Sequence, residues 1–342
     1  MTVGATLVAS LLLALGAPRT WPLALATFLL RGGILLVLAP IIVLPSAVAV
    51  GNVLTPLLSN VVFRGVATIA VLLGVVGFGA LLWLFGGGLI AAAAESELAR
   101  AVARDDEAWP RGRVAPDLVP TAHPAWRVLT VRLIAHLPLL LALSWGAIRI
   151  VAVTYRELTV PSDVGVALVV RVAGGATDAV VVVVVAWLLG ETIGGIAARR
   201  VVLIGERVPS ALGGATIRLV RHPLRCVVLA LVPLVVLLLV LVAVGLAGSA
   251  TWGALRAALS FGIDDVTDGV AALALVMILV GLFAGGLVLI GVISAWRAAV
   301  WTVDWAGTFG GAGYDPEGQW NSVVDSATLR DLRPRGVDPD PR

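Results

Sequence analysis

Residues 226–255 read CVVLALVPLVVLLLVLVAVGLAGSATWGAL and contain no charged side chain. A helix needs about 20 mostly apolar residues to cross the hydrocarbon core of a membrane, so this stretch is long enough for one span. Three further charge-free runs are found at residues 32–63, 65–94 and 269–296. Two weaker candidates, which contain a few ionisable groups, lie at about residues 133–153 and 173–197. The sequence therefore predicts an all-α protein, a polytopic integral membrane helix bundle with about six transmembrane helices.

The composition of the 342 residues agrees with a membrane protein. Hydrophobic residues make up 60% of the chain and charged residues only 13%, whereas a soluble domain carries about 25% charge. A net charge of only +3 argues against a nucleic-acid partner, although the pI is near 9.9. Cys226 is the only cysteine, which excludes a disulfide framework, and with three histidines we expect no metal or other cofactor.

Arginine supplies all 24 basic residues, and its distribution predicts the topology. The segments 95–132 and 199–225 carry six arginines each, whereas the loops that alternate with them carry few. By the positive-inside rule, both segments and both termini lie in the cytoplasm. The chain is thus expected to be a multi-pass protein of the plasma membrane.

Three segments follow along the chain. Residues 1–20 are expected to form an interfacial or re-entrant helix, because the apolar run 3–17 is short for a span; a seventh span is the alternative. Residues 21–305 form the six-span membrane domain. Residues 306–342 are polar and predict a largely disordered cytoplasmic tail, with at most a short helix near 319–332.

An internal repeat organises the membrane domain. Residues 83–102 match residues 281–300 at eight of twenty positions, and the WLLG at 187–190 aligns more weakly with the WLFG at 83–86. Each unit contains an amphipathic interfacial helix, a proline-containing span, an outer loop and a glycine-rich span. The six spans then form three repeated helix pairs, in units at about 21–103, 121–200 and 207–305.

The motifs of common membrane enzymes are absent from the sequence. There is no Gly-x-Ser-x-Gly or His-Glu-x-x-His pattern, and without lysine there is no P-loop. We therefore expect no enzyme and assign no catalytic residue. Glycines spaced by four, at 190 and 194 and at 281 and 285, favour close helix packing inside one bundle, with a dimer contact or a transport pathway as the alternative.

Ionisable side chains inside spans are costly and are candidates for function. In an antiparallel pair of helices, residues at equal depth have a constant sum of residue numbers, and Arg149 with Asp178 and His136 with Glu191 both give 327. We predict two intramembrane polar pairs, Arg149–Asp178 near the outer surface and His136–Glu191 towards the cytoplasm. Alternatively, Arg149 and Asp178 reach the outer interface separately.

The arginines after the fourth predicted span are candidate contacts for anionic lipid headgroups. Each basic residue beside an anionic membrane gains about 1 kcal/mol. The candidates are Arg199, Arg200, Arg218, Arg221 and Arg225. The alternative is that these side chains only fix the topology.

The layout resembles prokaryotic six-span membrane proteins with repeated helix pairs, such as the membrane domain attached to some glycerophosphodiester phosphodiesterases and similar uncharacterised families. The likeness covers about residues 20–305 and rests on the Arg-Gly-Gly at 31–33 before a proline-containing span and on the glycine-rich even spans. No phosphodiesterase domain is present in the sequence, so the resemblance implies a fold and no activity.

Two functions are consistent with these features. The first is a non-enzymatic membrane protein that interacts with lipid or scaffolds a membrane partner. The alternative is a transporter or permease subunit with a polar site in the middle helix pair. The expected partners are membrane lipids with anionic headgroups, together with either a protein partner or further copies of the chain.

Overall fold

The computed structural model describes residues 2–38, 66–105, 124–163, 165–166, 168–260 and 265–310. All regular elements in these ranges are helices. Six helical segments are long and apolar enough to cross a membrane, which confirms the predicted class, a polytopic helical membrane protein. They are Thr20–Leu38, Gly74–Asp105, Leu137–Thr159, Thr177–Ile204, Pro223–Ser260 and Val266–Trp305.

The α-helices follow one another along the whole described chain. Their bounds are α1 Val3–Gly16, α2 Thr20–Phe28, α3 Ile34–Leu38, α5 Val66–Leu82, α6 Gly88–Asp105, α7 Pro124–Ala135, α8 Leu137–Thr159, α9 Leu168–Gly175, α10 Thr177–Ile204, α11 Val208–Arg221, α12 Pro223–Ser260 and α13 Val266–Gly310. Two π-helical turns, η1 Leu29–Gly33 and η2 Trp83–Gly87, join α2 to α3 and α5 to α6.

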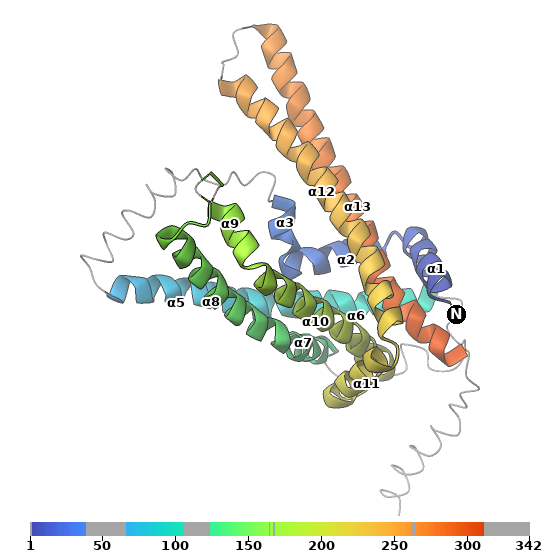
Figure 1. Cartoon of the computed structure of the whole chain (residues 1–342). Coiled ribbons are helices and arrows are strands. Elements are labelled where there is room, and N and C mark those ends of the chain that lie inside the picture. Colours follow the sequence, from blue (N-terminus) through green and yellow to red (C-terminus); the bar gives the residue numbers. More distant parts are fainter. Residues whose placement is uncertain are drawn as a thin grey trace, which may run out of the picture.

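The first of the six segments bends sharply at Gly32. This residue has φ +98°, a left-handed conformation that glycine adopts without steric cost. As a result α3 leaves α2 in a new direction (Figure 1). Within the expected span 32–63, residues 32–33 belong to η1 and residues 34–38 to α3, and residues 39–63, Pro40 included, lie outside the described residues.

Similar breaks separate α7 from α8 and α11 from α12. The backbone leaves helical geometry at His136 (φ −95°, ψ 4°) and at His222 (φ −134°, ψ 57°). Prolines 138 and 223 follow in the first turns of the next helices, where a missing N–H costs no helical hydrogen bond. Pro138 therefore begins its helix rather than kinking it, whereas Pro233 lies inside α12.

The helices meet at one end and spread apart at the other. In Figure 1 the α12–α13 hairpin, the α8–α10 hairpin and the continuous α5–α6 helix come together near α1 and α11 and diverge from there. Large apolar side chains such as Leu246, Met277 and Phe78 are exposed along the diverging parts. Exposed apolar helices of this length are suited to lipid as their solvent.

The common end, which we call the base, holds the buried core. Val128 and Val131 of α7 pack there against Val201 and Val202 of α10 and against Cys226 of α12. The spans also continue past their charge-free runs into this region. Residues 95–105, which the sequence placed in a loop, prolong α6 by three turns and bring Glu95 into the base.

The ends of the membrane domain differ in part from the expectation. The predicted amino-terminal helix is present as α1, and its 14 residues are too few for a span; its position relative to a membrane stays a prediction. The last helix continues to Gly310, so it includes the first five residues of the predicted tail. The expected short helix and disorder of the tail concern residues 311–342, which lie outside the described residues.

Candidate functional site

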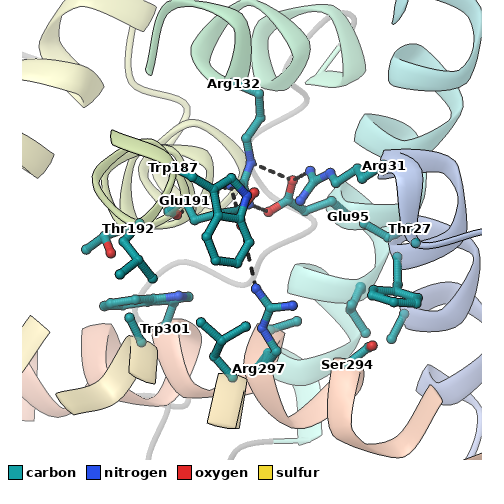
Figure 2. Close-up of a pocket in the computed structure, with 18 of the residues that line it drawn as sticks. Thr27, Arg31, Glu95, Arg132, Trp187, Glu191, Thr192, Ser294, Arg297 and Trp301 are labelled. Carbon is teal, nitrogen blue, oxygen red and sulfur yellow. Dashed lines mark hydrogen bonds and ion pairs between the residues drawn. The ribbon is translucent and has the colours of Figure 1, made fainter. Parts of the chain in front are cut away.

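A cavity of about 350 Å³ lies in the base, between the α2–α3 turn, α6, α7, α10, α12 and α13 (Figure 2). Its wall combines charged and hydroxyl side chains with two tryptophans and several leucines. The charged and hydroxyl side chains are Arg31, Glu95, Arg132, Glu191, Arg199, Arg297, Thr27, Thr192 and Ser294, and the tryptophans are Trp187 and Trp301.

Glu95 is the centre of the charged network. Its side chain is only 3% exposed and pairs with three arginines from three separate elements. Arg31 comes from η1, Arg132 lies 2.5 Å away through Nη2, and Arg199 lies 2.5 Å away through Nη1. Glu95 belongs to the buried face of α6, where Ala91, Ala92 and other small residues let the neighbouring helices approach closely.

A second carboxylate, Glu191, extends the network. Its oxygens lie 3.4 Å from Arg132 Nη1, 3.4 Å from His136 Nε2 and 3.9 Å from Arg297 Nη2. Arg132 thus bridges Glu191 and Glu95. Burial alone lowers the pKa of the Arg132 guanidinium, but the two carboxylates more than offset this and raise the pKa above its usual range. Arg132 therefore carries a fixed positive charge.

Glycines of α10 make room for this network. A Cβ at position 194 would approach Arg132 Cδ to 3.0 Å, and a Cβ at position 190 would approach the His136 ring to 2.9 Å. The first glycine pair therefore packs within one molecule, as the sequence favoured. By contrast, a Cβ at either position of the pair at 281 and 285 would meet no described atom within 4 Å.

Positive charge exceeds negative charge in the cavity wall. Four arginines face two glutamates among the lining residues, a formal surplus of +2. Two polar atoms of the wall, Arg199 Nε and Ser294 Oγ, are buried and have no hydrogen-bond partner among the described residues. Buried polar atoms are nearly always hydrogen-bonded, so two unsatisfied ones in the same wall mark a place for a ligand or water.

The structure brings both sequence-predicted polar pairs together. Arg149 Nε lies 3.1 Å from Asp178 Oδ2, and His136 Nε2 lies 3.4 Å from Glu191 Oε1. The two pairs have different surroundings. Arg149 and Asp178 are 42% and 48% exposed and do not line the cavity, whereas Glu191 lines the cavity and has two further arginine partners.

The first two candidate lipid contacts are engaged within the protein. The Arg199 side chain is 2% exposed, binds Glu95 and donates to the carbonyl oxygens of Gly195 and Ala298, so it lies inside the protein and not on its outer surface. Arg200 donates two hydrogen bonds, of 2.9 and 2.7 Å, to Glu206.

Two more of these candidates share one carboxylate. Arg218 Nη2 lies 2.5 Å and Arg225 Nη2 lies 2.6 Å from the oxygens of Asp304, whose side chain is 2% exposed. Arg221 is exposed. Four of the five candidates thus have carboxylate partners within the base, and their contact with anionic lipid stays a prediction.

Sequence reasoning missed Arg31, Glu95 and Arg297 as site residues. One signal pointed towards the centre of the network: the alignment of WLFG at 83–86 with WLLG at 187–190 places Glu95 opposite Arg199, its ion-pair partner. No such alignment places Arg31 or Arg297 opposite one of its carboxylate partners.

These observations define a multi-pass helical membrane protein with a cationic cavity at the base of its spans. No protein-family model, curated protein or solved structure matches the chain. The resemblance in layout to six-span membrane domains therefore stays an expectation, and the function has to be argued from the cavity.

Proposed function

We propose that the protein is a non-enzymatic membrane protein that binds an acidic membrane lipid, with the headgroup in the cavity of the base. The observation that carries this proposal is the +2 surplus of charge in a wall with two unsatisfied buried donor groups, Arg199 Nε and Ser294 Oγ. An anionic headgroup supplies both the missing charge and the missing acceptors.

An apolar groove next to the cavity, with a volume of about 30 Å³, offers a surface for the first carbons of a hydrocarbon chain. It lies between α3 and the α12–α13 hairpin and is lined only by aliphatic side chains, glycines and Phe283. Leu36 belongs to both the groove and the cavity, so the two meet at α3. A ligand with an anionic head and an apolar tail matches a charged cavity that continues into an apolar groove.

A transporter or permease subunit is the second candidate. The cavity is bordered by the broken helix at Gly32 and by three helical units that diverge from the base. Broken helices beside a charged site between helical units are typical of transporters. Under this reading the cavity binds a water-soluble anion, and Glu191 of the middle helix pair is part of the site.

We place the base on the cytoplasmic side of the plasma membrane, because the arginine-rich segments lie there by the positive-inside rule. Reporter fusions after Asp106, after Arg207 and at the carboxyl terminus should then all report cytoplasm. A periplasmic signal from the fusion after Arg207 would contradict this orientation.

The lipid proposal is tested by native mass spectrometry of the detergent-purified protein. We expect one acidic lipid bound per chain, and severalfold less lipid on Ala230→Phe, which fills the cavity from α12 without removing a charge. Arg297→Gln should also lower occupancy, whereas Arg256→Gln, an exposed arginine of the same charge, should not. Equal acidic lipid on all four proteins would place the lipid elsewhere and overturn the proposal.

A further inference from the structure

The charge of the cavity restricts the kind of headgroup it binds. This inference rests on the proposed function. Glu95 and Glu191 each neutralise one arginine, and two positive charges of the wall then remain. Buried charges are costly unless a partner of opposite sign and a full set of hydrogen bonds compensate them. The ligand that balances this wall carries two negative charges.

The donors come from two helices that touch, since Arg199 Nη2 of α10 donates to the Ala298 carbonyl oxygen of α13 over 3.0 Å. Arg199 of α10 offers its Nε. Ser294 and Arg297 of α13 are three residues apart, so they share one face of that helix. Figure 2 shows both side chains on the α13 side of the cavity, across from the Glu95 cluster. Arg297 is held only loosely, since its closest carboxylate contact is the 3.9 Å approach to Glu191.

A phosphomonoester has the chemistry that this wall lacks. Near neutral pH it carries about −1.5 to −2 charges and three acceptor oxygens. A phosphodiester headgroup carries one negative charge and has two non-bridging oxygens, which leaves one arginine and one donor uncompensated. Guanidinium groups bind phosphate oxygens through paired hydrogen bonds and charge.

We infer that the cavity selects a phosphomonoester dianion over singly charged headgroups, with Arg297, Arg199 and Ser294 as its donors. A phosphomonoester occurs both as a lipid headgroup and as free phosphate. The groove at α3 favours the lipid, and the two sources are separated by the experiment below.

The test compares three probes on the purified full-length protein in detergent micelles at pH 8. The probes are phosphatidic acid, phosphatidylglycerol and inorganic phosphate, and the measurement is the apparent dissociation constant from thermal-shift titration. We expect phosphatidic acid to bind at least tenfold more tightly than phosphatidylglycerol and to bind more tightly than inorganic phosphate. If inorganic phosphate binds as tightly as phosphatidic acid, the ligand is free phosphate, and the groove plays no part.

Lowering the pH to 5 sharpens the test. The second pKa of a phosphomonoester is about 6, so phosphatidic acid loses most of its second charge, whereas phosphatidylglycerol keeps its single charge. The preference should therefore fall severalfold. The ionisable groups that face the site are Glu95, Glu191, His136 and the four arginines, and phosphatidylglycerol measured at both pH values is the control for changes in the wall itself.

Two variants place the effect at the cavity. Arg297→Gln lowers the surplus to +1 and should make the two lipids bind about equally, whereas Arg256→Gln should keep the preference. Ser294→Ala removes one donor without a change of charge and should weaken phosphatidic acid binding by a smaller factor.

If both lipids bind equally to the unaltered protein, the dianion inference fails and the lipid-binding function stands. If neither lipid binds, both fail.

Discussion

Two sets of arginine–carboxylate contacts in the same protein differ mainly in burial. At the base, Glu95 and Arg199 are 3% and 2% exposed and belong to a network of several partners. Near the middle of α8, Arg149 forms a pair with Asp178 of α10, and each side chain is more than 40% exposed. Removing one partner of a buried set leaves an uncompensated charge, whereas an exposed group is solvated in its place. The comparison teaches that the Glu95 network depends on charge far more than the Arg149–Asp178 pair does.

The largest effect should come from Glu95→Gln, because it removes the shared partner of three arginines. Loss of one member of a buried ion pair costs about 3–5 kcal/mol. We expect a loss of this size in the free energy of unfolding, measured by denaturant titration in mild detergent. Glu97→Gln is the matched control, since Glu97 lies on the same helix and its side chain is 55% exposed. Equal losses for the two variants would show that burial does not distinguish them.

A smaller loss is expected for Asp304→Asn. Asp304 is buried, but its partners Arg218 and Arg225 are 15% and 27% exposed and can turn partly towards water. A hydrogen bond to a charged group contributes about 1.5–3 kcal/mol, and we expect a destabilisation in this range. Asp268→Asn, an exposed aspartate in the first turn of the same helix, should have no measurable effect. If Asp304→Asn lowered the free energy of unfolding as much as Glu95→Gln, the ion pairs of Asp304 with α11 and α12 would be as important for stability as the Glu95 network.

The smallest effect belongs to the exposed pair. Arg149→Gln and Asp178→Asn should each lower stability by at most about 1 kcal/mol, because exposed ion pairs contribute little. The double variant should be more stable than the sum of the two single effects predicts, since it leaves neither charge without a partner. The measurement is a double-mutant cycle in the same denaturant titration. Strict additivity would mean that the 3.1 Å contact contributes no coupling.

The sequence predicted the spans well because their signal is local. Length and apolarity decide whether a helix can cross a membrane, and both are visible in a run such as residues 226–255. The two polar pairs were also predictable, because α8 and α10 are consecutive spans that run antiparallel, and this sets which of their residues lie level.

The cavity could not be predicted in the same way. Glu95 meets partners that lie 64, 37 and 104 residues away along the chain, on separate elements whose approach depends on the packing of the base. Its position at the end of a charge-free run also made it look like the first residue of a loop. Arg218 and Arg225 look like members of a membrane-facing surface for a related reason: their acidic partner Asp304 lies 86 and 79 residues away along the chain.

The docking of α1 on α13 sets an order for assembly. Trp296 Nε1 donates hydrogen bonds to the Leu7 carbonyl oxygen and to Ser10 Oγ, a contact that joins residues 289 and 286 positions apart. During synthesis α1 therefore waits without this partner until α13 has emerged from the ribosome. Ser294 and Arg297 arrive on the same helix, so the cavity is completed in the same late step. A chain that stops before α13 would expose an unfinished polar site, which gives cellular quality control a feature by which to recognise incomplete molecules.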